Sequence, residues 1–143
     1  PISTILTFLI LLALSNNLAV LLKKLGEINL AILSYVTAIN FKPDYIEACN
    51  NLGLIYFETN EIQKSKCFFD KAFKIDSNNE ITNFNLGNIY FKQKKLFKAE
   101  FHFKKAIEIN SDFAEAFNNM GTTLKNQTGP QPTPTYQDSW RHH

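Results

Sequence analysis

Cysteine, tryptophan, methionine, glycine and proline are all scarce in this sequence, and their scarcity excludes several classes of protein. Two cysteines, Cys49 and Cys67, permit at most one disulfide bond and form no C-x-x-C pair, which excludes a disulfide scaffold and a structural zinc site. Five glycines and five prolines in 143 residues exclude collagen and, for most of the chain, low-complexity sequence. With 45% apolar and 20% charged residues, the composition fits one folded domain.

The sequence also contains no recognisable catalytic constellation. A Gly-rich phosphate loop, an H-E-x-x-H motif and a G-x-S-x-G motif are all absent. His102, the only internal histidine, lies between Phe101 and Phe103 with no nucleophile nearby in the pattern, so we interpret it as structural. Cys49 falls at a position expected to be packed and is interpreted as an inert core thiol. We therefore predict that the chain is not an enzyme and uses no cofactor or metal.

Charge argues against a nucleic-acid partner. The formal net charge is only +2, which is too balanced for a protein with a basic binding face. Lysines do cluster between Lys92 and Lys105 and alternate with aromatic residues. At helical spacing those rings would be core and the lysines a solvated outer face, and Glu100 and Glu108 dilute the charge. We expect no nucleic-acid binding.

The strongest signal is a repeat of 34 residues. Asn-Leu-Ala, Asn-Leu-Gly, Asn-Leu-Gly and Asn-Met-Gly begin at Asn17, Asn51, Asn85 and Asn119. Other columns keep the same spacing, among them Tyr35, Phe69 and Phe103, and Ala38, Ala72 and Ala106. An internal period of this length indicates stacked supersecondary units. The phase places repeats at 12–45, 46–79 and 80–113, with a partial fourth at 114–126.

Each repeat is predicted to hold two helices, because apolar residues recur at helical spacing in both halves. Gly26 and Asn60 fall where the first helix should end, and both tolerate left-handed backbone geometry. Lys94 occupies that position in the third repeat and predicts a less ideal turn. Gly53 and Gly87 should let the first helix approach its partner closely. N-capping boxes are predicted where the units join, at Asp44-x-x-Glu47, Ser77-x-x-Glu80 and Asp112-x-x-Glu115.

These columns resemble the signature of the tetratricopeptide repeat family, W-x2-L-G-x2-Y followed by A-x3-F, A and P. The resemblance covers residues 12–126 and holds at the L-G-x2-Y, A-x3-F and A positions. It departs at the Trp position, which holds Ser15, Cys49, Asn83 and Phe117, and only Pro43 keeps the Pro position. The resemblance implies an all-α, right-handed superhelical solenoid of antiparallel helix pairs, with the first helices lining its concave face.

The two ends of the chain do not fit the repeat. Residues 1–11 are nearly all apolar, and Asn16 and Asn17 interrupt the run before the roughly 20 residues that a bilayer span needs. We favour a helix packed on repeat one or the remains of a truncated repeat. A membrane association through residues 1–14, or a secretory signal cleaved at Ala13-Leu14-Ser15, is the alternative.

Residues 127–143 are predicted to be a flexible tail. Gly129, Pro130, Pro132 and Pro134 exclude the second helix that a complete fourth repeat would have. Tyr136 and Trp140 are expected to pack back on the apolar face of the partial repeat. His142 and His143 are interpreted as incidental rather than as a metal pair.

The concave face that the resemblance implies would carry a row of carboxamides, each of which can pair with a peptide backbone as both donor and acceptor. Aromatic and apolar neighbours could take the side chains of such a peptide. A ladder of this kind is similar to that of protein O-linked N-acetylglucosamine transferases. The predicted peptide-binding residues are Asn16, Asn17, Asn50, Asn51, Leu54, Phe57, Phe84, Asn85, Asn88, Phe91, Asn118 and Asn119. A clamp for a terminal carboxylate is disfavoured, because Asn50, Asn85 or Phe84 stand where it needs lysine and arginine.

We predict a non-catalytic, cytoplasmic scaffold that binds an extended peptide or partner protein along this face. One alternative is the substrate-recruiting arm of a larger enzyme, such as a glycosyltransferase similar to the O-linked N-acetylglucosamine transferases. Another is a membrane-tethered or exported scaffold. The sequence predicts neither the identity of the partner nor the oligomeric state.

Overall fold

The computed structural model describes residues 1–129 of the chain. Within them the chain forms seven α-helices and no strand. The helices are α1 (Ile2–Lys24), α2 (Ile28–Phe41), α3 (Ile46–Glu58), α4 (Ile62–Ile75), α5 (Glu80–Lys92), α6 (Leu96–Ile109) and α7 (Ala114–Gln127). The predicted all-α class is therefore confirmed.

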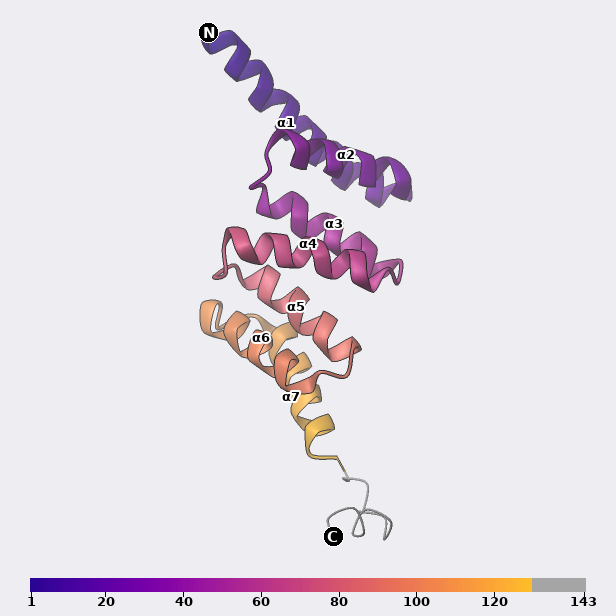
Figure 1. Ribbon diagram of the computed structural model, residues 1–143, viewed down its shortest axis with the longest axis vertical. Helices are drawn as coiled ribbons and strands as arrows, with labels where there is room; N and C mark the ends of the chain where they lie inside the picture. The colour runs from indigo at the N-terminus through magenta and orange to yellow at the C-terminus, as the bar shows by residue number, and fades with distance from the viewer. Residues whose placement is uncertain (130–143) are drawn as a thin grey trace, which may run out of the picture.

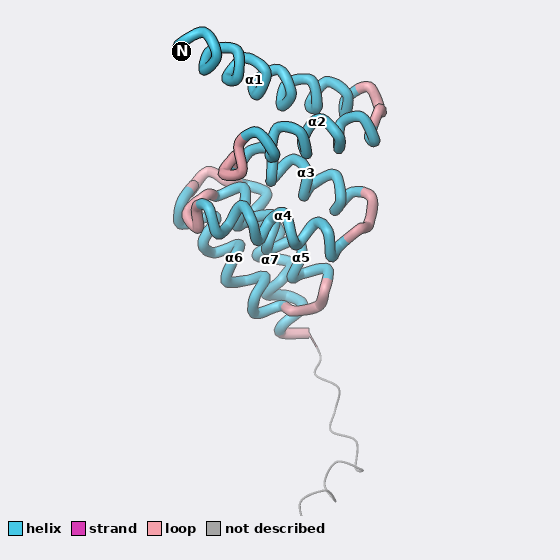
Figure 2. Tube along the Cα trace, turned by 45° about the horizontal axis from the view of Figure 1, so that its top comes forward, coloured by secondary structure: helices cyan, strands magenta, loops and turns pink. Residues whose placement is uncertain are grey.

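Consecutive helices turn back on one another and pack as pairs. α1 packs on α2, α3 on α4 and α5 on α6, and α7 follows against α6. The pairs are stacked along the longest axis of the molecule, with the N-terminus at one end and α7 at the other (Figure 1). The connecting turns alternate between the two sides of this stack (Figure 2). The architecture is the solenoid of antiparallel helix pairs that the 34-residue repeat predicts.

The units adhere to one another through buried apolar side chains. Leu52 and Ile55 of α3 share a buried cluster with Tyr35 of α2, the second helix of the preceding unit. Leu86 and Ile89 of α5 share another with Phe69 of α4. Because each helix pair is apolar on two sides, it is stable only when neighbours cover it.

Two glycines allow the helices of a unit to approach closely, as their position in the repeat predicts. A Cβ atom on Gly53 would lie 2.7 Å from the ring of Phe69, and one on Gly87 would lie 2.5 Å from the ring of Phe103. Both separations are shorter than van der Waals contact, so an aromatic ring occupies the space that any larger residue would need. Gly121 occupies the same column in the partial repeat and has nothing within 4 Å.

The turn inside each unit has a left-handed residue, as expected for Gly26 and Asn60. The φ angles are +82° at Gly26, +64° at Asn60 and +61° at Lys94. The third turn thus keeps the geometry of the other two although it carries a lysine. Lysine in place of glycine leaves the shape of the turn unchanged but raises its conformational free energy, because the lysine Cβ crowds the backbone in this region.

Replacing Lys94 with glycine should therefore stabilise the fold. We expect Lys94→Gly to raise the free energy of unfolding by about 1 kcal/mol, the cost of one left-handed non-glycine residue. Urea denaturation followed by circular dichroism measures the change. Lys104→Gly, an exposed position inside α6, should instead lower stability by about 0.5–1 kcal/mol. Equal effects of the two substitutions would contradict this account of the turn.

The predicted capping boxes are wrong. α3 begins after Tyr45 and α7 after Phe113, and neither helix has a side-chain cap hydrogen bond. At α5 the cap is Asn79, whose side chain accepts from the backbone N–H of Thr82. The loops between units carry turns of their own, which place the helix starts one or two residues later than the sequence pattern indicates. In one of these turns Asn110 Oδ1 accepts a hydrogen bond from the backbone N–H of Asp112.

The apolar N-terminal segment is not a separate element. It forms one continuous helix with the first helix of repeat one, and this helix passes through Asn16 and Asn17 without a break. The side chains of residues 1–11 are exposed, and this part of α1 projects past α2 (Figure 1). The ring of Phe8 makes an edge contact with Phe41 at 5.5 Å. Residues 1–11 are thus largely exposed, with Phe8 against Phe41 of repeat one, and the buried residues of α1 begin at Leu12.

Two further observations concern the ends of the chain. By length and composition, α1 is the one helix in residues 1–129 that could cross a membrane. The predictions for Pro130, Pro132, Pro134, Tyr136, Trp140, His142 and His143 fall outside the described residues.

Candidate binding surface

The first helices of successive units lie next to one another on one side of the array. α5 contacts α3 on one side and α7 on the other, while α2, α4 and α6 lie behind them. We call the surface formed by α1, α3, α5 and α7 the first-helix face. All twelve residues predicted to bind a peptide belong to these four helices.

Two hollows open between neighbouring helices of this face. The first has a volume of about 290 Å³ and is lined by Ile46, Glu47, Asn50, Asn51, Asn79 and Ile81, from α3 and the start of α5. The second has a volume of about 90 Å³ and is lined by Phe91, Asn119 and Thr122, from α5 and α7. Each hollow is bordered by an asparagine of the same repeat column, Asn51 in one and Asn119 in the other.

The asparagines of that column have different surroundings. Asn17 is exposed, Asn51 and Asn119 are half-buried, and Asn85 is buried. Asn119 Nδ2 donates to Asn88 Oδ1 at 2.8 Å, which joins α7 to α5 through two of the predicted residues. Burial raises the pKa of the Tyr35 hydroxyl to about 12, and the nearby Asn51 side chain partly opposes this rise.

The neighbouring repeat column holds Asn16, Asn50, Phe84 and Asn118. Part of this column forms hydrogen bonds between successive units and does not face solvent. Asn16 and Asn50 are buried, and Asn118 is exposed. Asn16 Nδ2 donates to Glu47 Oε1 at 2.9 Å, and Asn50 Nδ2 donates to Thr82 Oγ1 at 2.9 Å. The sequence analysis missed these links. The sequence feature that could have predicted them is a polar residue 31 or 32 positions after each asparagine, which is about one repeat further along the chain.

The apolar members of the face are partly buried. Phe84 packs against Phe113 with ring centroids 4.7 Å apart. Leu54 and Phe57 pack on the buried cluster that contains Phe69. The remaining surfaces of Phe57 and of Phe91 border the face, and the Lys92 ammonium lies 5.1 Å from the centroid of Phe57. Apolar side chains of a ligand would therefore meet aromatic edges rather than deep pockets.

Charges on this face are balanced. Lys23 of α1 and Glu58 of α3 form an ion pair at 3.0 Å, with both side chains partly exposed. An exposed pair of this kind contributes little to stability, but it neutralises the end of the face where α1 and α3 meet. The face thus presents amides and aromatic edges rather than one sign of charge.

His102 and Asn83 form a buried polar pair behind this face. His102 Nδ1 lies 3.1 Å from Asn83 Oδ1, and Asn83 Nδ2 donates to the backbone carbonyl oxygens of Ser77 and Asn79. The pair accounts for the polar residue at the position where the family signature has tryptophan. Burial lowers the pKa of His102 to about 4, so the ring is neutral near pH 7.

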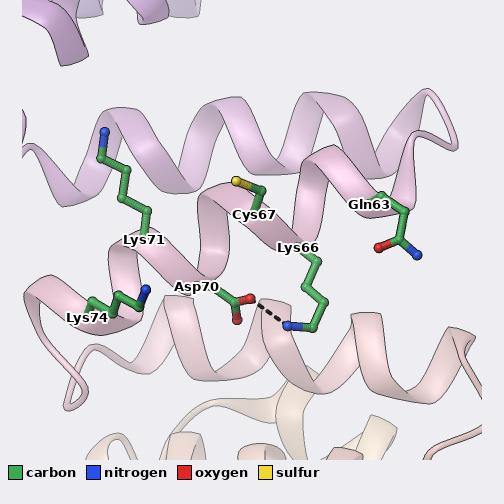
Figure 3. A pocket seen from close by; sticks show the side chains of 6 residues that line it. All are labelled: Gln63, Lys66, Cys67, Asp70, Lys71 and Lys74. Carbon is green, nitrogen blue, oxygen red and sulfur yellow. Dashed lines mark hydrogen bonds and ion pairs between the residues drawn. The ribbon is translucent and has the colours of Figure 1, made fainter.

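A further hollow lies on the opposite side of the array, along α4. It has a volume of about 440 Å³, and all its lining residues come from α4 (Figure 3): Gln63, Lys66, Cys67, Asp70, Lys71 and Lys74. Lys66 and Asp70 are paired at 2.5 Å. Because the residues follow one helix, they form a row rather than a converging constellation. Cys49, by contrast, is fully buried, and burial raises the pKa of its thiol.

No group of three or more His, Cys, Asp or Glu side chains within residues 1–129 could hold a metal ion.

Family models match three stretches of the chain. A model described as TPR repeat matches residues 20–60, and two described as tetratricopeptide repeat match residues 46–79 and 82–113. Together these stretches cover most of the helical array.

Two curated proteins from red algae are similar in sequence. Uncharacterized protein ycf37 of Pyropia yezoensis is 31% identical over 70 residues, which cover 49% of this chain and 39% of that protein. Uncharacterized protein ycf37 of Porphyra purpurea is 36% identical over 74 residues, which cover 52% of this chain and 43% of that protein. The chain thus spans about two fifths of the length of the curated relatives that it matches.

Solved structures share the fold at low sequence identity. The first TPR of Spaghetti (RPAP3) bound to the HSP90 peptide SRMEEVD has a TM-score of 0.77 and 16% identity, covering 81% of this chain and 92% of that chain. YrrB, a TPR protein with an unusual peptide-binding site, has a TM-score of 0.71 and 24% identity, covering 80% and 59%. An O-GlcNAc transferase of Thermobaculum terrenum has a TM-score of 0.79 and 18% identity, covering 87% and 24%.

Proposed function

Because this chain belongs to the tetratricopeptide repeat family, we propose that it is a protein-interaction scaffold that holds an extended peptide segment of a partner on its first-helix face. Of the solved structures with this fold, the first TPR of Spaghetti (RPAP3) is bound to an HSP90 peptide, and YrrB has a peptide-binding site. The family and the fold therefore support the general role, and the residues of the first-helix face support the specific mode.

The observation that carries the proposal is the pair of hollows between neighbouring first helices. Each is lined by an asparagine of one repeat column, Asn51 or Asn119. A carboxamide offers a donor and an acceptor side by side, which matches the N–H and C=O of an extended backbone. Recognition through the backbone tolerates many peptide sequences, and selectivity then comes from the apolar borders of the hollows, Ile81 and Phe91.

We divide the predicted asparagines into two groups by their repeat column. The side-chain amide of Asn16 donates to Glu47 and that of Asn50 donates to Thr82. We therefore propose that these two residues hold the first helices at their spacing. Asn17, Asn51, Asn85 and Asn119 form the column that we propose contacts the peptide. This division makes the proposal testable with neighbouring residues of the same type.

The double substitution Asn51→Ala with Asn85→Ala should weaken peptide binding without much change in melting temperature. The probe is the tightest-binding peptide selected from a random peptide library with the intact protein. We expect the dissociation constant to rise roughly tenfold, because each lost amide contact is worth about 0.5–1.5 kcal/mol. Fluorescence anisotropy with the labelled peptide measures the change.

Asn50→Ala is the comparison for stability, since this residue borders the same hollow as Asn51 but is buried and donates its amide to Thr82. We expect it to lower the melting temperature, because the Thr82 hydroxyl loses its partner on α3. An unchanged affinity in the double variant, or equal losses of affinity and of stability in the double variant and in Asn50→Ala, would argue against the proposal.

The second hypothesis is that the array recruits substrates for a larger enzyme. The match to an O-GlcNAc transferase covers 24% of that protein and 87% of this chain, and at 18% identity it concerns the fold alone. A catalytic domain joined to this array in the same polypeptide would support the hypothesis. The first-helix face would have the same binding role in both cases.

The hypothesis of a membrane-tethered or exported scaffold concerns α1. A span requires about 20 residues, which is nearly the whole helix. The second half of α1 is engaged in the array, where Asn16 bonds to Glu47 and Lys23 pairs with Glu58. Crossing a bilayer would break these contacts and bury Asn16 and Asn17 in lipid at a high cost. The packing of α1 therefore favours an occupant other than lipid for its exposed surface.

A further inference from the structure

One face of α1 continues the interface between units but is uncovered. Leu14, Leu18 and Leu21 occupy the columns of Ala48, Leu52 and Ile55 in α3 and of Thr82, Leu86 and Ile89 in α5. The residues of α3 and α5 are at most 1% exposed, because a preceding second helix packs nearby. Leu14, Leu18 and Leu21 are 58%, 49% and 53% exposed. The repeat columns whose residues are buried under a second helix in α3 and α5 are therefore exposed in α1.

This face belongs to a longer regular stripe. Residues along one side of α1 and its C-cap follow alternating steps of three and four: Thr4, Thr7, Leu11, Leu14, Leu18, Leu21 and Leu25. This spacing keeps side chains on one side of a helix and is typical of a seam between paired helices. We call these residues the α1 stripe.

The two halves of the α1 stripe have complementary shapes. In the first half, Ser3, Thr4, Thr7, Phe8 and Leu11 line a hollow of about 420 Å³. The Thr7 hydroxyl donates to the backbone carbonyl oxygen of Ser3 at 2.8 Å, so burial of this half would not leave that donor unpaired. The second half presents the projecting leucines, from Leu14 to Leu25. Thr4 and Thr7 in the first half thus leave room for two of the leucines of the second half.

We propose that this face binds the same face of a second copy of the chain, with the two α1 helices antiparallel. The exposed segment Ile2–Leu11 of one copy would cover Leu14–Leu25 of the other, and the reverse. A ten-residue helical segment is about 15 Å long, and Leu14 to Leu25 spans about 17 Å, so the lengths match. The pairing places Thr4 opposite Leu25, Thr7 opposite Leu21, Leu11 opposite Leu18, and Leu14 opposite its counterpart.

The antiparallel direction follows from the array itself. Every second helix runs antiparallel to the first helix of the next unit, as α2 does to α3. Ile2–Leu11 continue α1 as a straight helix and do not fold back over the face of their own chain. The segment of the second copy places a helix on this face in the direction that the array uses, and the contact closes as a two-fold dimer.

Charge supports the same direction. No charged side chain occurs between Ile2 and Leu22, and the first ones are Lys23 and Lys24. In the antiparallel pair these lysines lie at opposite ends of the interface. A parallel pair would bring the four lysines of the two copies together, where their repulsion would oppose association.

Sedimentation equilibrium of the full chain tests the proposal. We expect a dimer at tens of micromolar and a dissociation constant raised at least roughly 100-fold by Leu18→Glu with Leu21→Glu, because each dimer would bury these two leucines twice. Leu33→Glu is the control, an exposed leucine on α2 outside the α1 stripe, and should leave the dimer intact. Leu18 and Leu21 are exposed in the single chain, so we expect the variants to fold. Circular dichroism checks this.

Disulfide trapping tests the direction in a Cys67→Ser background, where the remaining Cys49 is buried. Leu14→Cys should form linked dimers on oxidation, because it lies at the two-fold axis. Leu25→Cys alone should not, whereas Leu25→Cys combined with Thr4→Cys should. Efficient linkage through Leu25→Cys alone indicates a parallel pair and overturns the proposal.

Two other results would also overturn it. One is a wild-type chain that remains monomeric at about 100 µM, a concentration at which even a weak interface of standard size associates. The other is a wild-type chain that is monomeric in buffer and floats with phosphatidylcholine vesicles while the double glutamate variant does not. Lipid would then be the occupant of the α1 stripe.

Discussion

Gly87→Leu is expected to unfold the middle of the array. A Cβ atom at this position lies 2.5 Å from the Phe103 ring, and Phe103 is fully buried between helices. Leucine adds three further carbon atoms beyond the Cβ, so the ring or the helix must move. We expect the free energy of unfolding to fall by roughly 3 kcal/mol or more, because overpacking in a dense core has no cheap relaxation. A thermal melt monitored by circular dichroism measures the loss.

Gly121→Leu is the matched control for this experiment. Gly121 stands in the same column one repeat later, and a Cβ atom there has no neighbour within 4 Å. We expect no loss and a gain of about 0.5–1 kcal/mol, because glycine inside a helix is less favourable than leucine and the added side chain meets no neighbour. A normal melt for Gly87→Leu, or equal losses at both positions, would show that the close approach of α5 and α6 does not depend on glycine.

Acid should destabilise the protein through His102. Its pKa is about 4 in the folded chain and about 6.5 in a model peptide, because burial penalises the charged ring. Above pH 6.5 the ring is neutral in both states, and its protonation does not affect stability. As the pH falls from 6.5 towards 4, only the unfolded chain takes up the proton. Stability should therefore fall by up to the order of 3 kcal/mol, and below pH 4 this contribution stays constant.

The groups around His102 support this direction. The positive charges of Lys105 and Lys66 also lower its pKa, while Asp70 raises it. The ring stacks on Tyr90 at 5.4 Å and meets Phe73 edge-on at 5.6 Å, so water has little access to it. Urea unfolding at pH 6.5 and at pH 4.5 measures the loss in the wild type. His102→Gln should show a smaller loss between the same two values, and an imidazole that titrates near 6.5 by NMR would contradict the prediction.

The fold could be predicted because every unit repeats the same environments. Ala38, Ala72 and Ala106 are all fully buried, and a residue type that recurs at a fixed spacing reports on such a shared contact. The turns were predictable for the same reason, since Gly26 and Asn60 have the left-handed geometry that their side chains permit. Local patterns between units were less informative. Asp44 and Asp112 have the sequence of caps, but the path of the loop places other residues at the helix starts.

The candidate site was only partly predictable, because adjacent residues on a helix point about 100° apart. Asn50 and Asn51 are the same residue type and border the same hollow, yet Asn50 is buried and bonded to Thr82 of the next unit, whereas Asn51 is only half-buried. Which asparagine faces the neighbouring unit depends on the angle at which the units stack. A single sequence does not specify that stacking angle. Asn83 poses a related problem. Its role depends on His102, 19 residues away on another helix, so neither residue can be interpreted alone.

The amide links between first helices have a consequence for how such an array evolves. Asn16 reaches Glu47, Asn50 reaches Thr82, and Asn119 reaches Asn88, and each link stops at the adjacent helix pair. No link in this series depends on the total number of pairs. Deletion of the α3–α4 pair would remove the Asn16–Glu47 and Asn50–Thr82 bonds and leave the Asn119–Asn88 bond unchanged, so the effect of such a change stays with the pairs that it touches.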